Sequence, residues 1–346
     1  MSISHNDHSS ALERLLREFG DRPQALRVDD LLLDVLRALQ AEQLDRLPLP
    51  GHGSTLQRWQ VLAQVAARDL GLAKLYEGHT DALAILAECA AGHHAQTGIW
   101  GVWAAEPPDA RVQIIAREGE EVRLQGRKGW CSGALQIDRA LITAWHDNQP
   151  QLVAIALDQP TQRINAGNWQ AQGMATTASV DIEFDNASGI AIGSPGQYLA
   201  RPGFWHGGAG IAACWYGAAQ ALATYLREHC HKPRTDPHAC AHLGAVDAAL
   251  YGARAALREC AAFIDREPGA DANLHVRRTR AQVEHAVDQV LHHVGRALGA
   301  TPFCRNSHFA RLSADLPVYL RQSHAERDLA ELGQQVAGLP AGAWQL

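Results

Sequence analysis

The chain has 346 residues, a mass of 37.5 kDa, 47% hydrophobic and 20% charged residues, and a mean hydropathy of -0.20. This composition is typical of a globular protein with two or three packed units, and it excludes a disordered or collagen-like chain. Lysine and arginine number 31 against 37 aspartates and glutamates, which gives a formal net charge of -6. Because no basic tract is present to neutralise phosphates, we do not expect a nucleic acid as a partner.

The start of the chain and its hydropathy predict neither a secretory nor a membrane segment. The first ten residues lack a basic region followed by an apolar stretch, and no window reaches about 18 uninterrupted apolar residues. The seven cysteines are widely spaced and form no C-x-x-C pair, so neither a disulfide framework nor a zinc knuckle is expected. We therefore expect a cytoplasmic protein with no membrane partner, whose cysteines are mostly reduced core residues.

The first 97 residues carry helical patterns only. Ser10 and Glu13 form a capping box ahead of leucines at helical spacing, and a second apolar stripe covers 31–39. After the Pro- and Gly-rich breaker at 47–54, a third helical region is expected from about 55 to 91. Residues 1–97 are therefore predicted to form an N-terminal helical domain.

The hydrophobic period changes from about 3.6 to 2 in the middle of the chain. Apolar and polar residues alternate on both sides of a turn around Gly119, which predicts a β-hairpin. Apolar runs at 140–145 and 152–157, and the alternation from Val180 to Phe184, continue this pattern. Residues 98–197 are therefore predicted to form a central β-domain, either a small barrel or a sandwich.

The helical period returns in the last part of the chain. Helices are expected at 211–229, 239–263, 276–298 and 315–336, separated by turns that contain glycine or proline. Their alanine-rich faces permit close packing and, if exposed, leave an apolar face for a partner subunit. We expect an α+β protein whose residues 198–346 form a C-terminal four-helix bundle and assemble a homodimer or homotetramer.

Three segments of the middle region carry a resemblance to a known family. They are WAAEP at 103–107, GRKGWCSGA at 126–134 and GMATTASVDIEFD at 173–185. In sequence and order they are similar to the β-domain of the acyl-CoA dehydrogenase superfamily, which includes a flavin monooxygenase branch. The expected order of helices, β-domain and bundle resembles the same family over nearly the whole chain.

The resemblance implies FAD, with the flavin ring lying between the β-domain and the bundle. Ala105 would offer backbone groups to the pyrimidine edge of the ring, while Trp130, Cys131 and Ser132 would pack and hydrogen-bond beside it. A cofactor that supplies the chemistry leaves the protein to provide oriented donors and a dry slot. Outside this motif, a tryptophan at a strand end is more often a core residue.

Two phosphate-binding features of the family are altered. Pro108, Asp109 and Ala110 stand in place of a Gly-Ser-Asp triplet, which removes the small residues beside the flavin pyrophosphate. The family's Arg-Phe-Gly segment is also replaced, and Arg234 is the candidate phosphate partner there because a guanidinium can bind phosphate through two hydrogen bonds. The alternative for Arg234 is a solvated loop arginine.

The family's catalytic glutamate is not found at its expected position. An overlay on Asp315 and Tyr319 places Ser323 there, and a serine alone cannot act as a general base. His324 is our first candidate for the base and Glu326 is another, and a histidine in this region resembles the flavin monooxygenase branch. The alternative for His324 is a solvated position at the start of a helix.

His206 is a second candidate for the base, at the entry to the predicted bundle. Glycines at 207, 208 and 210 would allow a ligand to approach the backbone, although they fit a loop equally well. His79 and Asp81 fall on a helix that borders the acyl pocket in the family, but an N-terminal cap is the simpler interpretation. No H-E-x-x-H motif is present, and the chain lacks the two E-x-x-H motifs of di-iron helical bundles, so no metal site is expected.

The resemblance predicts an FAD-dependent oxidoreductase that catalyses α,β-dehydrogenation of an acyl thioester or a related carbonyl substrate, with an electron-transfer flavoprotein as a possible acceptor. The alternative is a reduced-flavin-dependent monooxygenase of the same fold, supplied by a separate flavin reductase. In that enzyme His324 or Ser132 would handle the flavin hydroperoxide. The altered motifs leave a third hypothesis, a degenerate member of the family that serves as a binding or scaffold protein.

Overall fold

The computed structural model describes residues 5–20, 28–165, 167, 169–177, 179–233 and 236–345. The chain forms two compact units, each discontinuous in sequence. The barrel unit contains Met1–Leu49 and Gly71–Phe204, and the bundle unit contains Pro50–Leu70 and Trp205–Leu346. No helix in the described ranges is long and apolar enough to cross a membrane. The domain division at residues 97 and 197 stays a prediction.

The described part of the chain before residue 95 is helical, as predicted. It contains α1 (His5–Gly20), α2 (Val28–Ala41), α3 (Thr55–Arg68), α4 (Leu70–Glu88) and the short 3-10 helix η1 (Gly92–His94). The single helical region expected from 55 to 91 is in fact α3 and α4, because Asp69 between them has an extended backbone with φ -162° and ψ 130°. This break is also where the chain passes from the bundle unit to the barrel unit.

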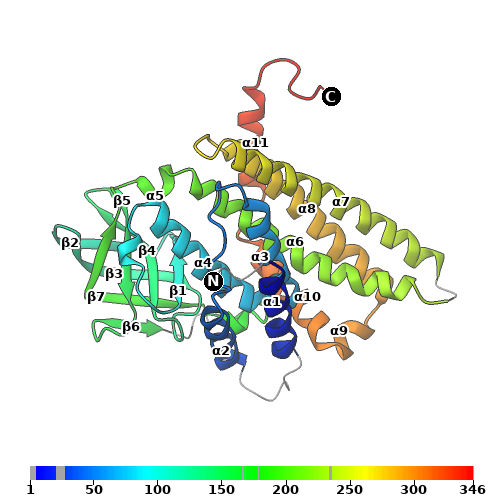
Figure 1. Cartoon of the computed structure of the whole chain (residues 1–346), viewed down its shortest axis with the longest axis horizontal. Coiled ribbons are helices and arrows are strands. Elements are labelled where there is room, and N and C mark those ends of the chain that lie inside the picture. Colours follow the sequence, from blue (N-terminus) through cyan, green and yellow to red (C-terminus); the bar gives the residue numbers. More distant parts are fainter. Residues whose placement is uncertain are drawn as a thin grey trace. The chain divides into compact units, whose positions relative to one another are not determined.

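The middle of the chain forms one closed sheet (Figure 1). Its strands are β1 (Trp100–Trp103), β2 (Val112–Glu118), β3 (Glu121–Cys131), β4 (Arg139–His146), β5 (Gln149–Ala156), β6 (Gln162–Asn165) and β7 (Val180–Ile192). The strand order is β1-β4-β2-β3-β7-β5, and β4 also pairs with β5, so the sheet closes into a barrel. The predicted hairpin around Gly119 is the β2–β3 pair.

Alternation along the strands fills the barrel. Leu124 of β3 and Ile182 and Phe184 of β7 are buried, while Glu183 between the last two is exposed. This alternation places one apolar face of each strand in the core, as the period of 2 predicts. Of the cysteines, Cys89, Cys131, Cys214 and Cys260 are buried as expected, whereas Cys230, Cys240 and Cys304 are not.

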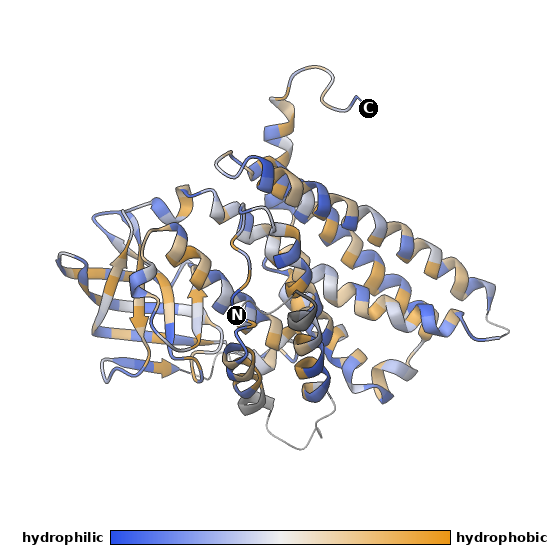
Figure 2. Cartoon of the chain, in the orientation of Figure 1, coloured by the Kyte–Doolittle hydropathy of each residue, from blue (hydrophilic) through white to orange (hydrophobic). Residues whose placement is uncertain are grey.

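The C-terminal part consists of helices that carry both hydrophilic and hydrophobic residues (Figure 2). They are α5 (Gln197–Ala200), α6 (Gly203–Cys230), α7 (Pro237–Arg266), α8 (Asn273–Leu298), α9 (Thr301–Arg305), α10 (Ser307–Leu320) and α11 (Glu326–Ala337). The helix expected at 315–336 is instead parts of α10 and α11, separated by a turn in which Ala325 has φ 47°. A positive φ cannot continue a right-handed helix, so the chain changes direction there.

Two helices of the bundle unit approach each other at backbone distance. A Cβ placed on Gly217 of α6 would lie 2.1 Å from the carbonyl oxygen of Ala63 in α3. Because real Cβ atoms do not come this close to a backbone oxygen, glycine is required at this position. The absence of a side chain at Gly217 therefore sets the separation of α3 and α6.

Candidate functional site

The three motif segments meet at one end of the barrel. Trp103 is the last residue of β1, Ser132 follows β3, and Thr177 ends the short 3-10 helix η2 (Ala175–Thr177) before β7. The indole Nε1 of Trp103 donates to the carbonyl oxygen of Ser132 (3.1 Å), and the amide of Gly133 donates to the carbonyl oxygen of Thr177 (2.7 Å). Segments that are distant in the sequence thus form one hydrogen-bonded surface within the barrel unit.

A chain of three hydroxyl groups runs through this surface, and its hydrogen bonds have one direction. Thr177 Oγ1 donates its single proton to the carbonyl oxygen of Met174 (2.7 Å), so it must accept from Ser179 Oγ, 3.0 Å away. Ser179 has then used its own proton, so Ser132 Oγ must donate to Ser179 Oγ across 2.8 Å. The remaining capacity of Ser132 Oγ is therefore to accept a hydrogen bond from another group.

Trp130 and Cys131 point in different directions at the end of β3. Trp130 has a left-handed backbone with φ 63°, and its side chain is 63% exposed. Such a conformation is uncommon outside glycine and often marks a functional site. Cys131 is fully buried, and this burial raises the pKa of its thiol well above the usual range. Cys131 is thus a core residue, whereas the indole of Trp130 is available to a ligand.

A buried lysine supports the 103–107 segment from inside the barrel. Lys128 Nζ donates to Thr143 Oγ1 (2.6 Å), which in turn donates to Glu106 Oε1 (2.8 Å). Burial lowers the pKa of Lys128 to about 8, although the negative charge of Glu106 acts to raise it. Glu106 also accepts from Trp145 Nε1 (2.9 Å), so the segment around the exposed residue Ala105 is held on its inner side.

The segment that replaces the family's phosphate-binding triplet is tied to the sheet by Arg127. Its Nη2 donates to the carbonyl oxygen of Asp109 (3.0 Å) and to the carboxylate of the same residue, while Nη1 donates to Asp181 Oδ2 (2.8 Å). The hydrogen bond from Arg127 is the main cause of the lowered pKa of Asp109. An ionised carboxylate therefore lies in the segment that the resemblance assigns to the pyrophosphate.

His79 is a buried structural residue rather than a helix cap. It lies inside α4, and the amide of Trp100 donates to its Nδ1 (3.1 Å). Because Nδ1 is the acceptor, the proton resides on Nε2, which donates to Asp45 Oδ2 (3.0 Å). The imidazole thus joins α4 to β1 and to the segment after α2, which corrects the expectation of an N-terminal cap.

In the bundle unit, Arg280 of α8 joins the two segments that carry the predicted histidines. Its Nη1 donates to the carbonyl oxygen of Gly208 (2.7 Å) and its Nη2 to that of Gln322 (3.2 Å). Gly208 follows the buried His206 by two residues, and Gln322 precedes His324 by two. This link has no signal in the sequence, because it depends on the packing of α8 beside the start of α6 and the end of α10.

The turn after α10 contains Ser323 and His324, and Glu326 follows at the start of α11. Ser323 is buried and donates to Glu284 Oε2 of α8 (2.5 Å), and Arg321 pairs with the other oxygen of Glu284 (2.8 Å). The side chain of His324 is 59% exposed and lies 3.4 Å from Asp328, and Glu326 is exposed in the first turn of α11. These positions agree with the solvated helix-start alternative for His324 and leave Glu284 as the carboxylate nearest to Ser323.

Arg234, the predicted phosphate partner, lies outside the described residues. Glu284 was not expected as a site residue because two complete helices, α9 and α10, separate it from Ser323 in the sequence. Lys128 was not expected either, although a lysine at an inward position of a strand is a detectable signal.

Comparisons of the sequence with protein-family models and with curated proteins gave no match. Solved structures do match. TdsC from Paenibacillus sp. A11-2, in complex with FMN and indole, has a TM-score of 0.76 and 18% identity over 96% of this chain and 97% of its own. KijD3 in complex with dTDP has a TM-score of 0.79 and 17% identity over 96% of each chain. A nitrososynthase from Micromonospora carbonacea var. africana has a TM-score of 0.77 and 16% identity over 96% of this chain and 95% of its own.

The chain has the acyl-CoA dehydrogenase fold. The resemblance found in the three motif segments is therefore confirmed at the level of the fold. In this acyl-CoA dehydrogenase fold, the motif segments form the barrel end that carries Trp130 and Ser132.

Proposed function

We propose that the chain is a flavin-dependent monooxygenase that binds reduced FMN at the barrel end formed by Trp130 and Ser132. The matching structures support an oxygenating enzyme better than an α,β-dehydrogenase. They include a dibenzothiophene monooxygenase, TdsC, and a 3-HSA hydroxylase from Rhodococcus sp. RHA1. TdsC and KijD3 have each been solved with FMN.

The observation that carries the proposal is the direction of the hydroxyl chain. Ser132 Oγ donates to Ser179 and can only accept from a ligand, because Thr177 directs the proton of each hydroxyl toward Met174. A reduced flavin presents an N–H donor at N5, whereas an oxidised flavin presents only an acceptor there. Ser132 is therefore matched to the reduced form, which a monooxygenase of this kind receives from a separate reductase.

The residues present fit an isoalloxazine ring better than they fit a dinucleotide. The exposed indole of Trp130 offers a flat apolar face against which a planar ring can pack. Asp109, held by Arg127, opposes a pyrophosphate in the segment where the family binds one. FMN lacks the pyrophosphate and adenosine of FAD, so we propose FMN in place of the FAD expected from the resemblance.

A bound reduced flavin would supply the redox chemistry: its two electrons would reduce dioxygen, one oxygen atom would enter a small organic substrate and the other would leave as water. The chain contributes orientation and exclusion of water. Ser132 would accept from the ring and Trp130 would pack against it, while the Lys128–Thr143–Glu106 network fixes the backbone around Ala105. Ser323 donates to Glu284, which is also paired with Arg321, so this carboxylate is already engaged by two partners.

Anaerobic titration with reduced and with oxidised FMN tests the proposal. We expect the purified chain to bind reduced FMN at least tenfold more tightly. In a Ser179→Ala variant, Ser132 has lost its acceptor and can donate to the ligand, so the preference should diminish or reverse. Consumption of oxygen in the presence of a flavin reductase is the second expected result.

Two other outcomes would overturn the proposal. Tighter binding of oxidised flavin, with bleaching by an acyl thioester under anaerobic conditions, would support dehydrogenation. Failure to bind either redox form of FMN or FAD in a folded protein would support the binding or scaffold hypothesis.

A further inference from the structure

We propose that His93, His94 and Glu120 form a binding site for a divalent transition-metal ion. The two histidines belong to η1, between α4 and β1, and Glu120 lies in the turn between β2 and β3. The site is at the start of β3, whereas Trp130 and Ser132 lie at its end. It does not depend on the proposed flavin function.

The ligand atoms are already close to a coordination geometry. One nitrogen from each histidine and one oxygen of Glu120 lie within 4.8 Å of one another. His94 Nε2 and Glu120 Oε2 are 3.2 Å apart. Bonds of about 2.1 Å to a tetrahedral zinc ion place neighbouring ligand atoms about 3.4 Å apart. The His94–Glu120 edge therefore matches such an ion, and the site needs only a small movement of the exposed His93 side chain.

The surrounding charge favours a cation at the turn. Glu118 and Glu121, which pair with each other across the hairpin, flank Glu120 and add two further carboxylates. Arg117 of the same hairpin donates from its Nε to the carbonyl oxygen of Gly119 (2.9 Å) and from its Nη1 to Gln151 Oε1.

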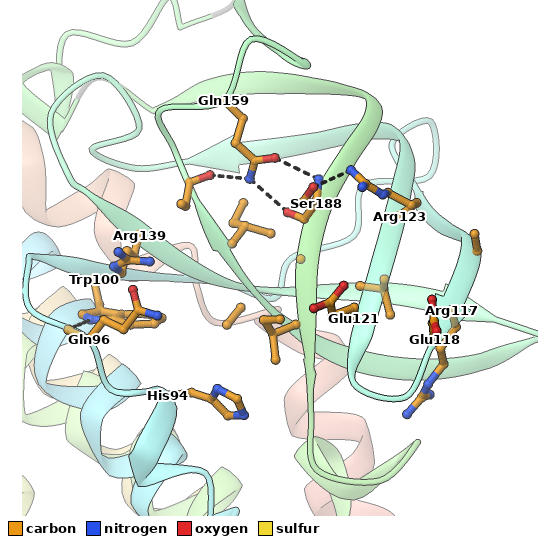
Figure 3. Close-up of a pocket in the computed structure, with 17 residues that line it drawn as sticks. His94, Gln96, Trp100, Arg117, Glu118, Glu121, Arg123, Arg139, Gln159 and Ser188 are labelled. Atoms are coloured by element: carbon orange, nitrogen blue, oxygen red, sulfur yellow. Dashed lines mark hydrogen bonds between the residues drawn. The ribbon is translucent and has the colours of Figure 1, made fainter.

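The site lies at the rim of a pocket of about 770 Å³ in the barrel unit, because His94 lines that pocket. In Figure 3, His94 extends from the side of Gln96 and Trp100 toward the side that carries Glu118 and Glu121. Arg139 and Arg123 line the same pocket. Three protein ligands leave at least one position of a tetrahedral ion for water or for an anionic ligand.

The donor types restrict the identity of the ion. Two imidazoles and one carboxylate suit zinc, cobalt, nickel or copper, whereas magnesium and calcium prefer oxygen donors only. Binding would also join η1 to the β2–β3 turn, two segments that are linked in the described structure by the His94–Glu120 contact. A bound ion should therefore stabilise the folded chain, since it binds a site that the unfolded chain lacks.

Calorimetric titration of the full chain with zinc, after dialysis against a chelator, tests the proposal, with cobalt as a spectroscopic probe. We expect one equivalent to bind, a rise in the unfolding temperature, and no comparable effect from magnesium. His93→Ala, His94→Ala and Glu120→Gln should each weaken binding at least tenfold. Circular dichroism of each variant checks that the chain remains folded, and Glu120→Gln keeps the size of the side chain.

The matched control is His242→Ala. His242 Nδ1 lies 2.8 Å from His293 Nδ1 in the bundle unit, so this pair is a competing place for an imidazole-binding ion. His242→Ala should leave the affinity for zinc and the number of zinc ions bound per chain unchanged. Loss of binding in His242→Ala, or unchanged binding in the combined variant of His93, His94 and Glu120, would overturn the proposal.

Discussion

The predicted site residues of the barrel unit and of the bundle unit differ in their contacts. At the barrel end, Ser132 is joined by hydrogen bonds to Trp103 and Ser179, which come from separate strands and loops. In the bundle unit, His324 and Glu326 are exposed at the start of one helix, and His324 contacts Asp328 of that same helix. A motif whose residues lie on several strands forms a site only when the chain folds, so its assembly is evidence for a function. A run of polar residues at the start of one helix can be explained by capping of that helix.

The largest expected effect concerns the buried contact of His79 in the barrel unit. His79→Ala removes the partner of Asp45 and leaves a buried carboxylate and the amide of Trp100 without their hydrogen bonds. We expect the free energy of unfolding to fall by about 3–5 kcal/mol, measured by urea denaturation. His146→Ala, at a half-exposed site in the same unit, should change it by less than about 0.5 kcal/mol. Equal stability of the two variants would contradict the structural role of His79.

Lys128 should make the stability of the barrel end depend on pH. Its pKa is about 8 in the folded chain against 10.5 for an ordinary lysine, so between these values the unfolded chain binds the additional proton. The free energy of unfolding should therefore rise with pH over this window, by up to about 3 kcal/mol from this group. The measurement is denaturation at a series of pH values, compared with Lys128→Met. If the free energy of unfolding of Lys128→Met changed with pH as steeply as that of the natural chain, Lys128 would not be the cause.

Two glycines test the packing of the bundle unit. Gly217→Ala introduces a Cβ about 2.1 Å from the backbone of α3 and should destabilise the chain by about 1–3 kcal/mol through overpacking. Gly244→Ala, in α7 with no atom within 4 Å of the new Cβ, should stabilise it by about 1 kcal/mol through helix propensity. Thermal unfolding monitored by circular dichroism measures both. If both variants changed the unfolding temperature in the same direction, the close approach of α3 and α6 would be contradicted.

The smallest expected effect compares the two candidate sites directly. Ser132→Ala should weaken the binding of reduced FMN about tenfold, equivalent to about 1.4 kcal/mol, because it removes the acceptor at the end of the hydroxyl chain. His324→Ala should leave binding and turnover within about twofold. Fluorescence titration under anaerobic conditions measures the affinities. The reverse order of effects would move the functional site to the bundle unit.

Most of the fold and part of the candidate site could be predicted from the sequence. Alternation predicted the strands, and the motif around Trp130 pointed to the barrel end, because both signals are local. The break at Asp69 was not visible, since a single extended residue inside a helical pattern has no composition of its own. The contacts of Lys128 with Thr143 and of Ser323 with Glu284 were not visible either, because they depend on strand register and helix packing.

The passage of the chain between its two units has a consequence for the order of folding. Residues 50–70 belong to the bundle unit, but the rest of that unit begins only at Trp205. During synthesis α3 leaves the ribosome before α6, with which it packs. The contact between α3 and α6 at Gly217 therefore closes a long loop that contains the whole sheet. Neither unit can be produced as one uninterrupted fragment, and a chain truncated before α6 leaves the apolar face of α3 exposed to aggregation.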